Sequence, residues 1–283
     1  ICSDLSVHHR RSSPSYSPNL VTSSPLSDLD RFKTLMLETP VPLDLTCLLA
    51  SGHCQGRTLN FDSELSKLDR LAEGVTVKTL SGVVEHIFGE MGFAGDEIHY
   101  FDPVNSYLDK VLERRKGIPI SLAVVILEVA RRCSLQAYGV GMPGHFLVGD
   151  AHDSDVFVDP FKGEMIDRSQ AQGLFNRMHP SSEFNSDYLS GVTNQAILSR
   201  MLNNLRIIRM KARASKDLIP ILELILCFEQ PSVAEARQLA SALESLGRID
   251  EAARQMEALA DRSDPGAAIE LRGLATRLWS QLN

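Results

Sequence analysis

One run of apolar residues constrains the fold of this 283-residue chain more than any other feature. Residues 121–133 read SLAVVILEVARRC, which is apolar at almost every position before its basic end. Pro119 stands just ahead of the run, and proline is well tolerated in the first turn of a helix because no backbone hydrogen bond is lost there. A helix that is apolar on nearly every face must be buried on all sides. The run therefore predicts a central helix that begins near Pro119 and is covered by other elements.

The residues after this helix predict a small antiparallel sheet. Residues 136–140, 145–150 and 155–159 have the composition and alternation of strands, and the polar loop between the last two is typical of a hairpin. We expect residue 147 to pair with residue 157. This register places His145 directly opposite Asp159 on one face of the hairpin, with Cβ atoms about 5 Å apart. The helix and the sheet together predict an α+β fold.

Helical periodicity flanks this core on both sides. Ahead of the core, the predicted helices cover residues 27–37, 42–50, 61–73 and 77–91. After it, they cover residues 190–214, 216–229, 233–246, 249–262 and 265–282. The Ala and Leu positions between residues 233 and 262 resemble a tetratricopeptide repeat, in which two antiparallel helices pack through small residues.

The composition of the N-terminal residues differs from that of the rest of the chain. Residues 1–26 are rich in Ser and Pro and poor in large aliphatic side chains, so we expect this segment to be disordered. We therefore expect three regions: a disordered segment at 1–26, an α+β domain at 27–185, and an all-helical tetratricopeptide-like region at 186–283.

Charge and cysteine content exclude several classes of function. The net charge of −7 argues against a broad phosphate-binding surface, so we expect no nucleic-acid partner. No apolar run approaches the roughly 18 residues of a membrane span, and the N-terminus lacks the apolar region of a secretory signal.

The five cysteines form no CxxC pair, which favours reduced thiols in a cytoplasmic protein. The first residue is not methionine, so we expect a fragment or a processed chain.

The His145–Asp159 pair supplies two of the three groups that cysteine acyl transfer requires. Such chemistry needs a thiol at a helix N-terminus, where the helix dipole lowers the thiol pKa, a histidine as base, and a carboxylate that orients the histidine. The position at the helix N-terminus is Pro119, which has no nucleophile. Ser121 points about 200° around the helix from Pro119, and Cys133 lies roughly 20 Å away at the other end.

Taken together, these residues resemble the motifs of a known family. The segment 92–163 is similar to the transglutaminase-like superfamily, whose motif of Gly-x-Cys-x-x-x-Ala, a histidine strand and an Asp-Pro strand corresponds here to Gly117, Pro119, Ala123, His145 and Asp159-Pro160. More narrowly, it resembles the SirB-like branch of that superfamily. The matching strings are Gly92-Phe93-Ala94-Gly95, Tyr100-Phe101-Asp102-Pro103-Val104-Asn105-Ser106-Tyr107-Leu108, Arg115-Lys116-Gly117-Ile118-Pro119-Ile120-Ser121-Leu122, Pro143-Gly144-His145-Phe146-Leu147-Val148 and Val158-Asp159-Pro160-Phe161.

The resemblance implies a papain-like core with a C-terminal tetratricopeptide-like tail. A proline in the cysteine position fits the SirB-like branch, and related domains also occur inside some F-box ubiquitin-ligase subunits. Two details depart from the branch: its usual Gly-Asn is here Gly95-Asp96, and its glycine-rich turn after Asp-Pro-Phe has only one glycine, Gly163. Both departures concern loop geometry.

Several interpretations of these residues stay open at this stage. His145 and Asp159 form a structural pair, line a binding pocket, or retain catalysis. Asp102 and Asn105 cap a helix locally or line the cleft, and a functional cleft also includes Tyr107, Pro119 and Gly144.

The function we expect is non-catalytic binding of a protein or peptide partner through the cleft and the helical tail, with no cofactor. The alternative is a hydrolase or acyltransferase that uses Ser121 as nucleophile. A metal-dependent activity has too few ligands in His145 and Asp159 alone.

Overall fold

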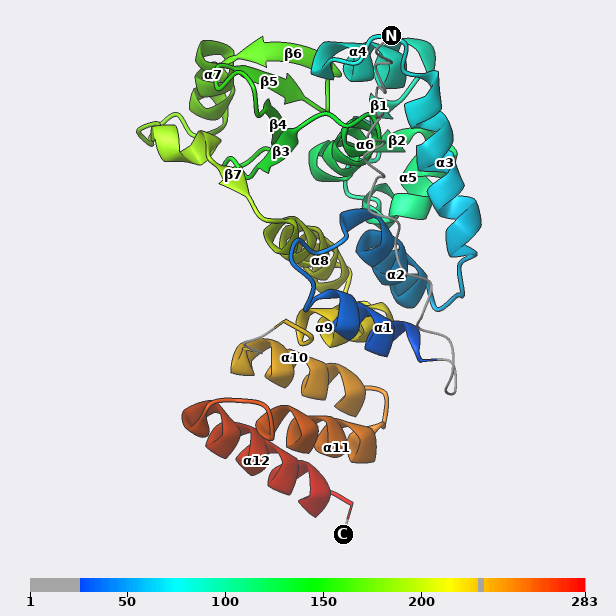
Figure 1. Ribbon diagram of the computed structural model, residues 1–283. Coiled ribbons are helices and arrows are strands. Elements are labelled where there is room, and N and C mark those ends of the chain that lie inside the picture. Colours follow the sequence, from blue (N-terminus) through cyan, green and yellow to red (C-terminus); the bar gives the residue numbers. More distant parts are fainter. Residues whose placement is uncertain (1–25, 229–231, 283) are drawn as a thin grey trace, which may run out of the picture.

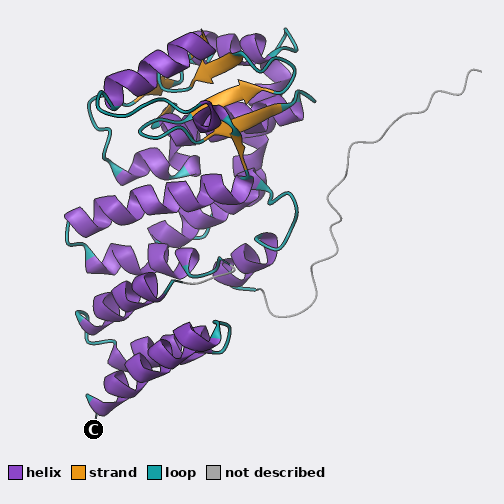
Figure 2. Cartoon of the chain, turned by 90° about the vertical axis from the view of Figure 1, so that its left-hand side faces the viewer, coloured by secondary structure: helices purple, strands orange, loops and turns teal. Residues whose placement is uncertain are grey.

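The computed structural model describes residues 26–228 and 232–282 (Figures 1 and 2). The predicted disordered segment therefore falls outside the described residues, except for Leu26. The first helices are α1 (Asp28–Leu35), α2 (Leu43–Gln55), α3 (Phe61–Gly74) and α4 (Leu80–Val84), the last of which continues as a π-helix, η1 (Glu85–Glu90). The predicted helix at 77–91 begins three residues later than expected, because the Thr79 side chain accepts the Gly82 N–H and caps α4 there.

The central helix, α6 (Pro119–Arg132), confirms the prediction from the apolar run. Pro119 occupies its first turn, and every residue from Pro119 to Ala130 is buried. The helix packs against α2, α3 and α4 and against two strands of the sheet. Just before it lie a 3-10 turn, η2 (Pro103–Ser106), helix α5 (Leu108–Arg114) and a short parallel pair, β1 (Ala94–Gly95) with β2 (Lys116–Gly117).

The sheet covers one side of α6 with five antiparallel strands in the order β6-β5-β4-β3-β7. Their bounds are β3 (Ala137–Val140), β4 (Leu147–Asp150), β5 (Val156–Asp159), β6 (Glu164–Asp167) and β7 (Gly191–Val192). Val148 and Val158 belong to the core around α6, whereas Leu147 and Phe157 belong to a separate core with helix α7 (Arg168–Met178). The alternation of side chains thus gives the sheet two buried faces.

The register of the β4–β5 hairpin differs from the expected one by two residues. Val148 pairs with Val158 and Gly149 with Phe157, and His145 precedes β4 instead of lying within it. A shift of two residues leaves every side chain on its original face. The expected face for His145 and Asp159 is therefore retained although the pairing was wrong.

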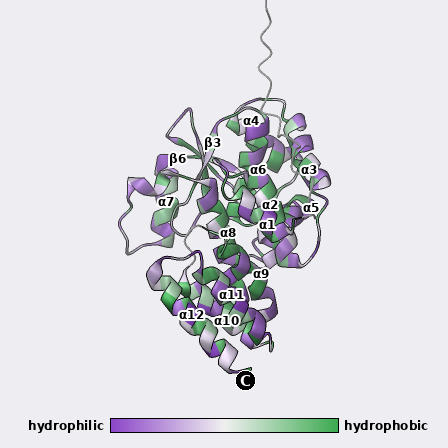
Figure 3. Ribbon diagram, turned by 60° about the horizontal axis from the view of Figure 1, so that its bottom comes forward, coloured by the Kyte–Doolittle hydropathy of each residue, from purple (hydrophilic) through white to green (hydrophobic). Residues whose placement is uncertain are grey.

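Helices follow one another from the sheet to the C-terminus, where Figures 1 and 2 show them stacked away from the core. Their bounds are α8 (Asn194–Lys211), α9 (Ser215–Ile225), α10 (Val233–Glu244), α11 (Ile249–Ala260) and α12 (Pro265–Ser280), preceded by the 3-10 turn η3 (Ser186–Leu189). Helices α10–α12 carry both hydrophobic and hydrophilic residues (Figure 3) and share a core rich in Ala and Leu.

The main core extends past residue 185, because β7 pairs with β3 and α8 contributes Ile197, Leu198 and Leu202 to the core around α6. The division into domains and the tetratricopeptide-like character of the tail stay predictions. The α+β fold with helical ends is confirmed.

No helix among the described residues combines the length and apolarity that a membrane span requires.

A partly buried ion network ties the end of α6 to α2 and α3. Arg132 donates to Asp44 and to Glu128, both at 2.7 Å, and to Asp69 at 2.7 Å, and Arg131 reaches Glu128 at 2.7 Å. Burial alone would raise the pKa of Asp44, but the two guanidinium groups and the Leu45 N–H lower it overall. Burial and the charge of Asp44 raise the pKa of Glu128. The two arginines therefore neutralise the buried carboxylates of Asp44 and Glu128, besides placing positive charge at the C-terminal end of the α6 dipole.

Candidate functional site

The predicted contact between His145 and Asp159 is present. The His145 Nε2 atom lies 2.8 Å from Asp159 Oδ1, and the two side chains are only 12% and 6% exposed. Asp159 ends β5, and its Oδ1 also accepts the Phe161 N–H at 3.0 Å. The carboxylate thus fixes one ring nitrogen of His145, which is the orienting role that an acid plays beside a base.

The environment of Asp159 favours its ionised form. Burial raises the pKa of this carboxyl, but the hydrogen bond and charge of His145 and the N–H groups of Phe161 and Lys162 lower it below its ordinary value overall. A carboxyl whose pKa is lower in the folded than in the unfolded protein stabilises the fold above the unfolded pKa, and this contribution is lost as the pH falls through the folded pKa.

We expect Asp159→Asn to lower the free energy of unfolding by about 1–2 kcal/mol at pH 7, because neutral hydrogen bonds replace charge-assisted ones. The deficit should shrink steadily below about pH 4 as the wild-type carboxyl is protonated. Urea denaturation of both proteins between pH 3 and pH 7 measures it. A deficit that stays constant over this range would contradict an ionised Asp159.

The turn that carries His145 is held from two sides. Gly144 has a φ of +78°, and an added Cβ would lie 2.8 Å from His179 Nε2, so glycine suits this position. On the other side, the Arg200 Nη2 atom of α8 donates to the carbonyl oxygens of Met142 and His145, both at 2.9 Å. Helix α8 therefore helps to position the histidine, a role that the sequence analysis missed.

The start of α6 holds no free nucleophile. Pro119 is buried in the first turn, and the Ser121 side chain is fully buried. The Ser121 hydroxyl accepts the Ile118 N–H at 3.1 Å and lies 2.6 Å from the carbonyl oxygen of Asn105, to which it donates. No hydrogen bond within the described ranges joins Ser121 to His145. The hydroxyl serves as a helix cap and a link to η2.

Ser121→Ala is expected to destabilise the fold by about 1–3 kcal/mol, because it leaves the buried Ile118 N–H and Asn105 carbonyl without their side-chain partner. Chemical denaturation measures this loss. Ser241→Ala, on an exposed position of α10, is the matched control and should cost less than about 0.5 kcal/mol. Equal stabilities of the two variants would show that the Ser121 hydroxyl is not a structural cap.

Asp102 and Asn105 organise the loop between β1 and α5. Asp102 is exposed and accepts the Val104 N–H at 3.0 Å, so it caps η2. Asn105 is fully buried, donates to the His99 carbonyl at 2.7 Å and accepts from Arg114 at 2.8 Å. Arg114 also reaches the buried Asp96 at 3.0 Å. These bonds fix the loop at both ends.

Residues 98–101, here called the aromatic loop, expose apolar side chains near the His–Asp pair. Ile98 is 83% exposed, Phe101 69% and Tyr100 37%. The ring of Tyr100 lies 5.7 Å from that of Phe161, two residues after Asp159, and Lys211 of α8 lies 5.8 Å from the ring centre of Phe101. The aromatic loop therefore reaches from the turn after Asp159 to the end of α8.

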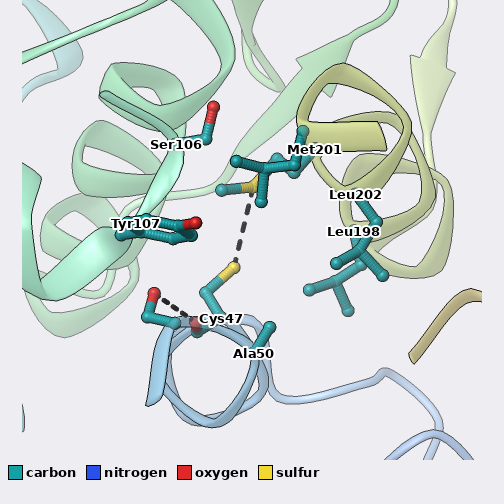
Figure 4. A pocket seen from close by; sticks show the side chains of 9 residues that line it. Cys47, Ala50, Ser106, Tyr107, Leu198, Met201 and Leu202 are labelled. Carbon is teal, nitrogen blue, oxygen red and sulfur yellow. Dashed lines mark hydrogen bonds between the residues drawn. The ribbon is translucent and has the colours of Figure 1, made fainter. Parts of the chain in front are cut away.

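Tyr107 does not lie in this exposed region. Its side chain is 4% exposed and lines a cavity of about 10 Å³ between α2, η2 and α8, beside Cys47 and Met201 (Figure 4). Such a volume holds about one water molecule at most. Tyr107 is therefore part of the interior, because its ring fills the space between two packed helices.

Burial disfavours the thiolate form of three cysteines near the core. Burial raises the pKa of Cys54 to about 12 and that of Cys227 to about 11, and it also raises the pKa of Cys47. Cys133 lies at the opposite end of α6 from Pro119, with its Sγ 3.4 Å from the Lys78 Nζ. In residues 26–228 and 232–282, no group of three or more His, Cys, Asp or Glu side chains is placed to hold a metal ion.

Comparison with known proteins identifies the family. The sequence profile described as the transglutaminase-like superfamily matches residues 61–203, slightly more than half of the chain. This chain belongs to the transglutaminase-like superfamily. The match includes α6, the sheet and most of α8, and therefore the His145–Asp159 pair and the start of α6 at Pro119.

Bacterial UPF0162 proteins and a mammalian F-box only protein share part of this sequence. A UPF0162 protein of Xylella fastidiosa strain Temecula1 is 39% identical over 132 residues, which are 44% of this chain and 47% of the relative. A UPF0162 protein of Pseudomonas aeruginosa is 35% identical over 140 residues, 48% of this chain and 52% of the relative. Mouse F-box only protein 21 is 26% identical over 194 residues, 64% of this chain and 30% of the relative.

These matches cover only part of each relative's length. The chain spans about half the length of the UPF0162 relatives it matches. No solved structure matches it significantly.

Proposed function

We propose that this chain is a non-catalytic transglutaminase-like protein of the SirB-like branch that binds a protein or peptide partner in the cytoplasm. The observation that carries the proposal is Pro119 in the first turn of α6. In the superfamily motif that position belongs to the nucleophilic cysteine, and proline has neither a thiol nor a hydroxyl. The His145–Asp159 pair thus stands intact without the group it would activate.

The aromatic loop is the surface that best suits a partner near this pair. Exposed aromatic side chains supply large contact area at little cost in conformational entropy, and they are enriched at the centres of protein interfaces. The ring of Tyr100 contacts the rings of both Phe101 and Phe161, and the backbone N–H of Phe161 donates to Asp159. A peptide held there contacts the same turn that orients His145. The helices after α8 offer further surface for a protein partner.

The alternative function, a hydrolase or acyltransferase with Ser121 as nucleophile, has no observation in its favour. A nucleophilic serine needs a base within hydrogen-bond reach of its hydroxyl. The Ser121 hydroxyl instead donates to the Asn105 carbonyl and accepts from the backbone of Ile118. A metal-dependent activity finds only two ligands in His145 and Asp159, fewer than a catalytic metal site uses.

Peptides selected from a random display library against the full chain test the proposal. We expect selected peptides to bind at least about 10-fold more weakly to the double variant Tyr100→Ala/Phe101→Ala, since truncated aromatic anchors typically cost more than 1 kcal/mol each. Val77→Ala, at a 57% exposed apolar position between α3 and α4, is the matched control and should bind as the wild type does.

Two results would contradict the proposal. One is selected peptides whose affinity is the same for the double variant and the wild type. The other is steady turnover of a peptide amide or ester that is lost in His145→Ala.

A further inference from the structure

The C-terminal end of α8 carries exposed apolar side chains that continue the surface of the aromatic loop. Ile207 and Met210 are 41% and 44% exposed, and because they lie three residues apart they share one face of the helix. Lys211 follows one turn after Ile207, and its Nζ atom lies 5.8 Å from the ring centre of Phe101. Helix α8 also packs against η2, which comes directly after the aromatic loop. The exposed apolar surface therefore extends from the aromatic loop onto α8.

Positive charge is concentrated in the same part of the chain. The whole chain has a net charge of −7, yet residues 188–216 contain six basic residues and no acidic one. The six are Arg200, Arg206, Arg209, Lys211, Arg213 and Lys216. The last three are exposed and belong to residues 211–216, here called the basic turn, which joins α8 to α9. The basic turn is thus a positive site on a negatively charged protein.

The three cations of the basic turn have no carboxylate partner among the described residues. The arginines just before them differ in this respect. Arg206 pairs with Glu235 at 3.4 Å, and Arg209 pairs with Asp217 at 3.1 Å. The acidic side chains nearest in sequence to the basic turn are therefore already used, and its own cations are available to a partner.

Acidic side chains in and beside the aromatic loop do not neutralise this charge either. Asp96 pairs with Arg114 at 3.0 Å, and Glu97 pairs with Lys162 at 2.7 Å. Asp102 is exposed and bonds a backbone N–H, and within the described residues 96–102 it is the one carboxylate without a cation. Three unpaired cations against one unpaired carboxylate leave this surface positive, so its charge complements an acidic partner.

We infer that the partner of the aromatic loop is an acidic peptide segment, whose apolar side chains contact Phe101 and Met210 and whose Asp or Glu side chains contact Lys211 and the rest of the basic turn. The inference rests on the proposed function and adds the charge of the partner to it. A peptide suits this surface better than an anionic bilayer does. A bilayer meets the field of the whole chain with its net charge of −7, whereas a short peptide meets only the charges within a Debye length of about 8 Å.

The peptides selected from the random display library against the full chain test this inference. We expect them to contain more Asp and Glu than the unselected library does. Synthetic copies should bind about 3- to 10-fold more weakly to Lys211→Gln/Lys216→Gln in fluorescence anisotropy, because two exposed charge pairs are lost. Arg70→Gln/Lys78→Gln is the matched control. It removes two exposed cations near Cys133, at the other end of α6, and should leave binding unchanged.

Salt separates the effect of charge from that of shape. Raising the NaCl concentration from about 50 mM to about 500 mM should weaken peptide binding to the wild type more than binding to Lys211→Gln/Lys216→Gln, since exposed charge pairs are screened. Equal salt dependence of the two proteins would contradict the assigned role of the basic turn.

Two further results would overturn the inference. The first is a set of peptides that bind Tyr100→Ala/Phe101→Ala weakly but show no acidic enrichment and bind the lysine variant as they bind the wild type. This result leaves the proposed function standing. The second is binding of the full chain to phosphatidylserine vesicles that the lysine variant loses, since the basic turn then serves a membrane surface. Peptides whose affinity is unchanged in the aromatic variant contradict the proposed function whatever their charge, and recovery of no peptide overturns both proposals.

Discussion

Replacing Pro119 with cysteine is expected to create a thiol whose pKa lies well below the value of about 8.5 for a free cysteine. The new side chain would stand in the first turn of α6, where the helix dipole favours a thiolate, and in the motif position that the superfamily places beside its histidine. At pH 6 we expect its alkylation by iodoacetamide to be on the order of 10-fold faster than that of free cysteine, after allowance for the lower intrinsic nucleophilicity of a low-pKa thiolate.

Two further variants make this test specific. Thiolate absorbance titrated in Pro119→Cys against Pro119→Ala measures the thiol pKa directly, without depending on access of the reagent to a buried position. Adding His145→Ala should raise that pKa by removing the histidine partner. A thiol pKa near 8.5 that does not respond to His145→Ala would mean that the His–Asp pair does not serve the start of α6.

Arg132→Ala is expected to lower the free energy of unfolding by about 3 kcal/mol at pH 7, because it leaves two buried carboxylates with only Arg131, whose side chain is 57% exposed, as their shared cation. Asp44 and Glu128 are 6% and 3% exposed, and Arg132 contacts both. Arg254→Ala breaks an exposed ion pair within α11 instead, with side chains 62% and 51% exposed, and should cost less than about 1 kcal/mol. Urea denaturation of the three proteins measures the difference.

The sign of the pH dependence follows from the pKa of Asp44. In the wild type this pKa is lowered, so Asp44 stabilises the fold above the unfolded pKa, and that contribution is lost as the pH falls through the folded pKa. Without Arg132, protonation relieves the repulsion between Asp44 and Glu128. The deficit of Arg132→Ala should therefore be largest at neutral pH and shrink towards pH 4. A deficit that grows on acidification would contradict the network.

The local patterns of the sequence were sufficient to predict the central elements. The apolar run and Pro119 predicted α6, because a helix that is buried on every face has apolar residues at nearly every position. The hairpin and the contact of His145 with Asp159 were also predictable from alternation alone. The register was not, since a shift of two residues preserves the same faces and the polar loop fits both pairings.

Other parts of the fold depend on signals that were weak or distant. Helix α7 and strand β6 were not predicted, although Asp167 and Gln170 form a capping box whose three-residue spacing is visible in the sequence. Arg200 holds His145 across 55 residues, and Arg132 contacts Asp44 across 88. Such pairings are set by tertiary packing, and no local pattern distinguishes them from solvated charges.

The burial of Tyr107 was missed for the same reason. Its position in the motif suggested a cleft, but the packing of α2 against α8 encloses it. The motif identifies Tyr107 by its position in the sequence, whereas the exposure of its side chain depends on helices α2 and α8, which lie more than 50 residues away in the sequence.

Intact-mass labelling of the folded wild-type chain with iodoacetamide and a fluorophosphonate shows whether the His145–Asp159 pair serves any nucleophile. Because Pro119 carries no nucleophile, we expect no serine adduct and no adduct at the start of α6. We also expect slow alkylation of Cys54 and Cys227, whose thiols are largely protonated at pH 8. A single stoichiometric serine adduct that disappears in His145→Ala would instead show that the His145–Asp159 pair activates a nucleophile and that the protein is an enzyme.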